Sequence, residues 1–243
     1  MKALVLEAYN KFVYRDYPDP KLRGPGDVLV RVRAAAICGS DVHGMDGSTG
    51  RRVPPIVMGH EAAGEIVEVG SGVGDFAPGD RVTFDSTEYC GECFHCRRGE
   101  VNLCENRRVL GVSCADYRRD GTFAEYIVLP RRILYRIPEG LDFVGASIAE
   151  PAAVAAHAAA ITPMAMGDSM AVVGAGLIGL LLIQILRAHS PAAIIALETD
   201  PERRAAALAA GASAALDPTA PETPAAILSL SGGRGVDRDR KSV

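Results

Sequence analysis

The chain has 243 residues, of which 48% are hydrophobic and 23% charged, and its formal net charge is −4. This composition is typical of a soluble globular protein, and the length suits one large domain or two smaller ones. The chain shows neither the basic stripe of a nucleic-acid-binding protein nor an uninterrupted apolar run long enough to span a membrane. The N-terminus lacks the apolar core of a signal peptide, so we expect a cytoplasmic protein.

The first 150 residues are predicted to be mostly β structure. Residues 3–6, 27–34 and 62–69 are short segments rich in β-branched or apolar side chains, each bounded by Gly, Pro or Asp. Residues 76–82 indicate a tight turn that leads into a further strand. Irregular strands separated by turns at close intervals favour a partly open barrel over a parallel sheet.

Residues 151–243 are predicted to be α/β. An alanine-rich helix at 151–161 precedes a strand at 169–173, a helix at 177–188, a strand at 193–197 and a helix at about 202–210. Strands and helices that alternate in this way form a parallel sheet with right-handed crossovers and helices on both faces. We therefore expect an α/β protein with two domains, 1–150 and 151–243.

Four cysteines lie close together in the first region: Cys90, Cys93, Cys96 and Cys104. In a chain without a secretory signal, clustered cysteines bind metal more often than they form disulfides. Four thiolates close the shell around a zinc ion, so this lobe (about 88–106) is predicted to hold structural zinc. An iron–sulfur cluster is disfavoured, because the last gap is seven residues and Glu105 replaces the expected proline. Metal-free thiols and His95 as a competing ligand remain alternatives, and Cys114 is interpreted as a structural thiol.

A second set of metal-binding side chains precedes this lobe. Cys38 offers a thiolate, His60 an imidazole and Glu61 a carboxylate. A catalytic zinc needs about three protein ligands and one open position for water or substrate. Each residue alone is only weak evidence for a metal site, since an isolated cysteine, for example, is usually a small buried hydrophobe. The combination with the cysteine lobe and a nucleotide-binding turn predicts a catalytic zinc.

The nucleotide-binding turn is Gly174-Ala175-Gly176-Leu177-Ile178-Gly179, between a predicted strand and a predicted helix. In this motif Gly174 makes the turn, Gly176 lets the backbone approach a pyrophosphate, and Gly179 allows close packing of helix on strand. The phosphates then bind near Leu177 and Ile178, where the first N–H groups of the helix have no intrahelical partner.

An acidic residue closes the next predicted strand. Glu198 lies near the spacing of the residue that accepts hydrogen bonds from both ribose hydroxyls, and its charge would repel a 2′-phosphate. The sequence therefore favours NAD over NADP. Asp200 is a rival for this position, and Arg203 or Arg204 could bind a phosphate.

In this order the motifs resemble those of the zinc-containing medium-chain alcohol and polyol dehydrogenases. The resemblance rests on Cys-Gly-Ser-Asp-x-His at 38–43, Gly-His-Glu at 59–61, the cysteine lobe and the glycine turn. Ala149-Glu150-Pro151 is similar to the sorbitol, threonine, butanediol and galactitol-1-phosphate dehydrogenase branch. The resemblance implies a GroES-like domain followed by a Rossmann domain, one catalytic and one structural zinc, and NAD. It also implies a small alcohol or polyol substrate and a homodimeric or homotetrameric full-length protein.

The resemblance also implies roles for individual residues. Cys38, His60 and Glu150 become catalytic zinc ligands, and Glu61 a ligand that exchanges with water. Ser40 and His43 relay the proton from the substrate to solvent. Asp41 orients a zinc-bound histidine. As alternatives, Ser40 and Asp41 form only a polar turn, and Glu150 only caps a helix that begins at Pro151.

The end of the chain departs from the family pattern. An apolar strand is expected after Asp237, but residues 238–243 carry consecutive charges of mixed sign that do not suit a buried strand. We therefore expect an incomplete Rossmann sheet and little or no turnover by this chain alone. A non-catalytic zinc-binding remnant, or an interaction partner of an intact homologue, is the alternative from another functional class. A zinc-free reductase of the same superfamily is a minor alternative.

Overall fold

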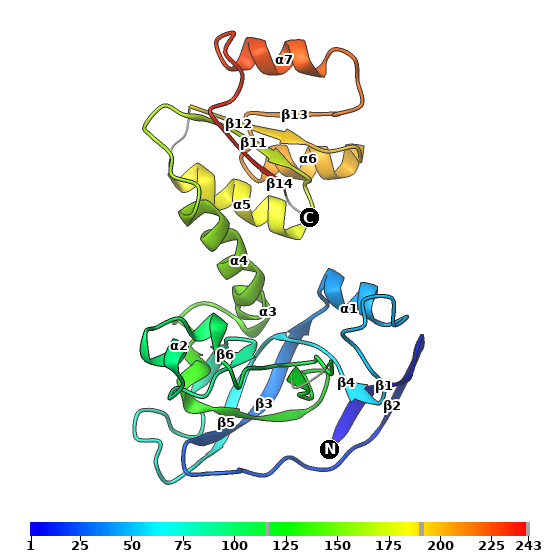
Figure 1. Cartoon of the computed structure of the whole chain (residues 1–243), viewed down its shortest axis with the longest axis vertical. Coiled ribbons are helices and arrows are strands. Elements are labelled where there is room, and N and C mark those ends of the chain that lie inside the picture. Colours follow the sequence, from blue (N-terminus) through cyan, green and yellow to red (C-terminus); the bar gives the residue numbers. More distant parts are fainter. Residues whose placement is uncertain (115–116, 190–191, 242–243) are drawn as a thin grey trace. The chain divides into compact units, whose positions relative to one another are not determined.

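The computed structural model describes residues 1–114, 117–189 and 192–241. The chain divides into two compact units, Met1–Glu150 and Pro151–Val243, which are described separately (Figure 1). Among the described residues, no helix combines the length and the apolar character that crossing a membrane would need.

The first unit is built from antiparallel strands. Its main sheet has the order β10-β6-β5-β3-β9, with β3 at Asp27–Ala36, β5 at Glu61–Val69, β6 at Arg81–Phe84, β9 at Tyr126–Pro130 and β10 at Leu134–Arg136. A second sheet has the order β2-β1-β4, with β1 at Lys2–Ala8, β2 at Lys11–Asp16 and β4 at Ile56–Val57. The short strands β7 (Thr87–Glu88) and β8 (Arg108–Val109) form a third pair.

The main buried cluster of this unit lies on one face of the main sheet. Val28 and Val30 in β3, Ile66 in β5, Val82 in β6 and Leu129 in β9 are at most 1% exposed. Alternate residues of a strand point to the same face, so these side chains pack together in one cluster. Burial of this apolar surface is the main force that holds the strands in register.

Short helices connect the strands of the first unit. They are α1 (Gly39–Gly44), α2 (Phe94–Arg97), η1 (Val101–Leu103), η3 (Arg131–Ile133) and α3 (Phe143–Ser147). Helix α4 (Ala149–Ala160) begins at the end of this unit and continues into the second. It starts two residues earlier than predicted. Pro151 therefore lies in its first turn, where a missing N–H leaves no helical hydrogen bond unmade.

The second unit is a parallel sheet of the order β13-β12-β11-β14. The strands are β11 (Ser169–Val173), β12 (Ala193–Leu197), β13 (Ala214–Leu216) and β14 (Arg238–Lys241). They are connected by α5 (Leu177–Ala188), α6 (Pro201–Ala209) and α7 (Thr223–Leu230). Within this unit, Figure 1 shows α5 and α6 on one side of the sheet and α7 on the other. The predicted fold class, α/β with a GroES-like region and a Rossmann-type sheet, is confirmed.

As expected, residues 238–241 do not form a buried strand, but they do join the sheet. The charged residues after Asp237 form a strand, β14, which pairs with β11. Its side chains are exposed or half-exposed, so the mixed charges stay in contact with water. The Asp237 carboxylate anchors its start, accepting hydrogen bonds of 2.8 Å from both the backbone N–H and the hydroxyl of Ser169. Strand order therefore reverses beside β11, at the point where dinucleotides bind in such sheets.

Candidate active site and metal centres

Strand pairing brings the predicted ligands of the first ion together. In the main sheet, Ala36 at the end of β3 pairs with Glu61 at the start of β5. Cys38 lies two residues after the end of β3 and is the N-cap of α1, where its backbone oxygen accepts a 3.0 Å hydrogen bond from the N–H of Asp41. His60 immediately precedes β5. Two segments that are distant in sequence thus present a thiol, an imidazole and a carboxylate at one place.

The ligand atoms of Cys38, His60 and Glu61 all lie within 4.8 Å of one another. Cys38 is half-buried, whereas His60 is 9% and Glu61 1% exposed. Among the described residues, His60 Nδ1 and Glu61 Oε2 are buried without a hydrogen-bond partner. A buried carboxylate oxygen without a partner is costly unless a cation compensates it. Thiolate, imidazole and carboxylate are also the donors that zinc takes in proteins, so these residues fit the ion.

The Asp41 carboxylate interacts with both His60 and Cys38 and shifts the pKa of His60. Its Oδ1 lies 3.6 Å from His60 Nδ1, and its Oδ2 accepts a 3.2 Å hydrogen bond from the backbone N–H of Cys38. Burial lowers the pKa of His60, but the interactions with Asp41 and the Cys38 thiol outweigh burial and raise this pKa to about 10. Burial raises the pKa of Asp41, but His60, Arg52 and the Cys38 N–H together hold it below its usual value.

Three other predicted residues lie outside the three-residue set. Glu150 lies in the first turn of α4, where its Oε1 accepts a 3.2 Å hydrogen bond from Ser86. Burial raises the pKa of this carboxyl group. Ser40 is exposed, and its hydroxyl accepts a 3.4 Å hydrogen bond from Arg52. His43 is also exposed, in the last turn of α1.

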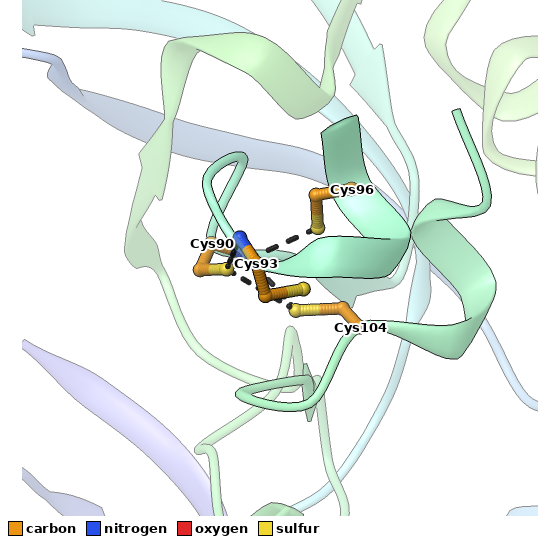
Figure 2. Close-up of side chains that lie close together, drawn as sticks. All are labelled: Cys90, Cys93, Cys96 and Cys104. Carbon is orange, nitrogen blue, oxygen red and sulfur yellow. Dashed lines mark hydrogen bonds between the residues drawn. The ribbon is translucent and has the colours of Figure 1, made fainter. Parts of the chain in front are cut away.

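The four cysteines of the lobe point toward one another (Figure 2). Their sulfur atoms all lie within 4.8 Å of each other, and all six cysteines of the chain are free. Backbone N–H groups of Glu92 and Cys93 lower the pKa of Cys90 to about 6, whereas desolvation raises the pKa of Cys96 to about 12. Backbone N–H groups also lower the pKa of Cys93, so the lobe favours thiolates at Cys90 and Cys93, and a cation would favour the others. His95 lies 2.9 Å from the Glu100 carboxylate and is not part of the set.

The glycine turn joins β11 to α5 in the second unit. Gly174 donates a 2.8 Å hydrogen bond to the oxygen of Leu197, and Gly176 is the N-cap of α5. A Cβ on Gly179 would lie 2.0 Å from the Gly174 oxygen, whereas a Cβ on Gly176 would meet nothing within 4 Å. Helix packing therefore requires glycine at 179. At 176 nothing in the protein itself requires it, which is consistent with a site that a ligand approaches.

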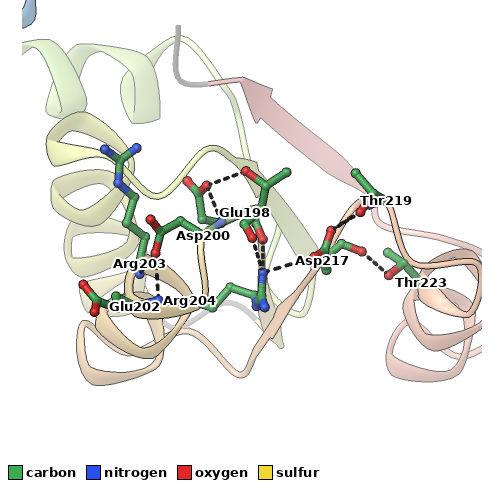
Figure 3. A network of polar contacts seen from close by, with 9 residues as sticks. Glu198, Asp200, Glu202, Arg203, Arg204, Asp217, Thr219 and Thr223 are labelled. Atoms are coloured by element: carbon green, nitrogen blue, oxygen red, sulfur yellow. Dashed lines mark hydrogen bonds and ion pairs between the residues drawn. The ribbon is translucent and has the colours of Figure 1, made fainter.

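The acidic residues after β12 have different tasks (Figure 3). Glu198 accepts hydrogen bonds from the N–H groups of Ala175, at 2.8 Å, and Asp200, at 3.1 Å, and these bonds lower its pKa. Asp200 caps α6, with its Oδ1 2.8 Å from the N–H of Glu202 and 3.1 Å from that of Arg203. Glu198 is therefore the carboxylate that lies at the glycine turn.

The two arginines of α6 also differ. Arg204 donates to the backbone oxygens of Glu198 and Thr199, at 2.8 Å and 2.7 Å, and lies 3.4 Å from the Asp217 carboxylate (Figure 3). Arg203 is exposed. Arg204 is thus committed to the protein, which leaves Arg203 as the arginine that can meet a ligand.

Comparison with known proteins relates this geometry to a family. Residues 24–139 match the model of the alcohol dehydrogenase GroES-like domain. The sorbitol dehydrogenase of Halalkalibacterium halodurans is 36% identical over 241 residues, which cover 98% of this chain and 68% of that protein. The chain belongs to the zinc-containing medium-chain alcohol and polyol dehydrogenase family.

Solved structures of this family agree with the fold. Alcohol dehydrogenase TADH from Thermus sp. ATN1 has a TM-score of 0.93 and 32% identity, over 100% of this chain and 70% of that one. A structure described as a zinc-binding dehydrogenase from Sinorhizobium meliloti 1021, bound to NADP, has a TM-score of 0.88 and 36% identity, over 100% and 69%. The resemblance proposed from the sequence is confirmed. The chain spans between 56% and 68% of the length of the curated dehydrogenases it matches.

Within this dehydrogenase fold, sequence reasoning missed one buried residue at the candidate ion site. Arg52 is 3% exposed and lies 3.4 Å from Asp41. An arginine in a loop with proline and glycine on either side gives no sequence signal of burial, because arginine is usually exposed. The neighbouring motif at 38–43 predicted Asp41 but not the residue that pairs with it.

Proposed function

We propose that this protein is a zinc-dependent dehydrogenase that transfers hydride from a secondary alcohol of a small polyol or related hydroxy compound to NAD. The observation that carries the proposal is the convergence of Cys38, His60 and Glu61 within 4.8 Å, with a buried carboxylate oxygen that has no partner in the part of the chain that the structure describes. Similarity to a sorbitol dehydrogenase supports the substrate class. The cysteine lobe would hold a second, structural zinc.

The side chains have distinct roles in this proposal. Cys38, His60 and Glu61 hold the ion, which, when bound, lowers the pKa of an alcohol hydroxyl and so makes hydride departure possible. Asp41 keeps His60 oriented. The exposed Ser40 hydroxyl accepts the substrate proton and His43 passes it to solvent, since imidazole titrates near neutral pH.

The cofactor would bind in the second unit. The N-terminal N–H groups of α5, at Leu177 and Ile178, would bind the pyrophosphate, and Gly176 would let it approach. The Glu198 carboxylate would accept hydrogen bonds from the ribose hydroxyls and repel a 2′-phosphate. Arg203 lies close by and could meet the adenine end. These features support NAD, although an NADP-bound relative is similar to this chain.

Metal analysis and turnover test the proposal together. Purified wild-type chain should contain about two zinc ions, whereas Cys38→Ala should contain one and lose whatever turnover of polyols with NAD the wild-type chain shows, which we expect to be small. Cys114→Ala is the matched control, because Cys114 is outside both ligand sets. If Cys38→Ala kept both ions, the assignment of the ion site would be wrong. If the wild-type chain held both ions but neither bound NAD nor turned over any polyol, the non-catalytic alternative would be favoured.

Glu61 and Glu150 are alternative acidic ligands. The family branch indicated by Ala149-Glu150-Pro151 implies Glu150, whereas the geometry favours Glu61. Glu61→Gln should therefore weaken the zinc at Cys38 and His60 more than Glu150→Gln does, as measured by competition with a chelator. The opposite order would assign the ligand position to Glu150.

A further inference from the structure

Arg52 is a buried arginine to which the proposed function gives no role. It lies in the loop between α1 and β4 and is 3% exposed. Its stem passes close to α1, because a Cβ on Gly44 would lie only 2.6 Å from Arg52 Cγ. A guanidinium group stays protonated in proteins, so this loop places a permanent positive charge in the interior. Such a charge is tolerated only when a partner compensates it.

The partner of Arg52 is the carboxylate beside the candidate ion site. Arg52 Nη2 lies 3.4 Å from Asp41 Oδ1, and both side chains are at most 4% exposed. The same nitrogen lies 3.4 Å from the hydroxyl oxygen of Ser40. Among the described residues, Arg52 Nε is buried without a partner. The guanidinium is therefore directed at two residues of the Cys-Gly-Ser-Asp segment rather than at solvent.

Within the described ranges of the chain, the other polar contacts of Asp41 lead to candidate metal ligands. The oxygen that faces Arg52 also lies 3.6 Å from His60 Nδ1. The second oxygen accepts a 3.2 Å hydrogen bond from the backbone N–H of Cys38. A rotation of the Asp41 carboxylate would therefore disturb both the imidazole and the backbone that carries the thiol. Arg52 and His60 face the same carboxylate oxygen, Asp41 Oδ1. By restraining this oxygen, Arg52 restrains the whole carboxylate and so affects its contacts with both His60 and Cys38.

We propose that Arg52 is a positioning residue, which fixes the Asp41 carboxylate and the Ser40 hydroxyl and thereby aligns His60 and Cys38 on one ion. The inference rests on the proposed function, since it assumes an ion at Cys38, His60 and Glu61. A positioning role for Arg52 can be distinguished from a purely structural ion pair by what a substitution at this position changes. A structural pair would change the stability of the fold, whereas a positioning residue also changes the affinity and the coordination geometry of the ion.

The test uses the full chain with cobalt(II) or zinc(II) as the probe. Arg52→Met keeps the length of the side chain but removes its charge and its donors, and Arg52→Lys keeps the charge without the planar fork. Arg51→Met is the matched control, because Arg51 is the neighbouring residue and is exposed. Chelator competition gives the affinity at each site, and the visible spectrum of bound cobalt gives its geometry. The cysteine lobe serves as an internal reference in every sample.

We expect Arg52→Met to weaken the ion at Cys38, His60 and Glu61 by about ten- to a hundredfold, to change its cobalt spectrum and to leave the cysteine lobe unaffected. Arg52→Lys should fall in between, and Arg51→Met should match the wild type. In an Asp41→Asn background, Arg52→Met should have much less effect, because Arg52 acts through Asp41. If Arg52→Met does not fold, the affinity and the cobalt spectrum of Arg52→Lys test the inference instead.

Two results would overturn the inference in distinguishable ways. If the wild-type chain binds an ion only at the cysteine lobe, the proposed function fails and this inference fails with it. If the wild-type chain binds both ions, and the folded Arg52 variants keep the affinity and spectrum of Arg51→Met, only the positioning role of Arg52 is wrong.

Discussion

His60 experiences opposing influences in the metal-free protein, and their balance predicts a pH dependence. Its pKa in the fold is about 10, above the ordinary value of 6.5. The protonated imidazole therefore stabilises the metal-free fold fully below pH 6.5, and this contribution is lost as the pH rises toward 10. We expect the difference in unfolding free energy between wild type and His60→Gln to decrease over that range. Each unit of pKa difference corresponds to at most about 1.4 kcal/mol.

Zinc should reverse this trend, because the ion needs the neutral imidazole and competes with its proton. Denaturant titrations of metal-free and zinc-loaded protein at several pH values would test both halves of the argument. A wild-type to His60→Gln difference that stayed constant in the metal-free protein would show that the Asp41 and Cys38 interactions do not hold the proton on His60.

Glu198 and Asp200 are two acids close together with different expected effects. Glu198→Gln should lower NAD affinity about tenfold and reduce the preference over NADP, because the charge that repels a 2′-phosphate is gone. Asp200→Ala removes the cap of α6 and should lower the unfolding free energy by about 1 kcal/mol while leaving NAD affinity within about twofold. Calorimetric titration with both nucleotides and thermal unfolding measure these effects. A reversal of the two phenotypes would make Asp200 the ribose ligand.

Single residues also show where sequence reasoning ends. Cys38, His60 and Glu61 could be proposed from chemistry and order alone, and pairing of Ala36 with Glu61 explains why they meet. Arg52 could not be proposed, since its burial depends on room left by Gly44 and on a partner eleven residues away. Such contacts arise from tertiary packing, which local sequence patterns do not reveal.

At the scale of elements, two glycines in the turn between β11 and α5 are required for different reasons, Gly179 for packing and Gly176 for the proposed approach of the nucleotide. Gly179→Ala should destabilise the second unit, because its Cβ would meet backbone 2.0 Å away. Gly176→Ala should fold normally, since nothing lies within 4 Å of its Cβ, and should instead weaken NAD binding. Thermal unfolding and nucleotide calorimetry on the two variants would separate the effects. If Gly176→Ala bound NAD as tightly as wild type, the pyrophosphate would not pass over this residue.

Periodicity predicted most elements of the second unit, including β11, α5 and β12 with the bounds that the structure has. Residues 214–216 and 238–241 were not recognised as strands. Ala214–Leu216 is too short for a pattern, and Arg238–Lys241 carries the wrong polarity for a buried strand. Arg238–Lys241 nevertheless forms a strand, because it pairs with β11 and because the Asp237 carboxylate anchors its start. The expectation that these charges do not suit a buried strand holds, since β14 is exposed or half-exposed, but side-chain polarity reports burial and could not reveal the backbone pairing with β11.

At the scale of the whole molecule, the two compact units divide the proposed chemistry, with both candidate metal-binding sets in Met1–Glu150 and the glycine turn in Pro151–Val243. Contacts within each unit stabilise it, so damage to one should leave the fold of the other intact. This arrangement predicts that metal content and nucleotide affinity can be changed separately.

Cys96→Ser tests this independence, because Cys96 belongs to the cysteine lobe and lies outside the Cys38, His60 and Glu61 set. Loss of one ligand should release the structural zinc, since a four-thiolate shell binds far more tightly than three thiolates and a hydroxyl. We expect one zinc fewer per chain and a lower temperature for the first unfolding transition, because metal binding contributes directly to the stability of its unit. NAD affinity should stay within about threefold of wild type, the scatter expected for an unrelated site. A parallel loss of zinc and NAD binding would instead mean that the second unit depends on the lobe for its fold.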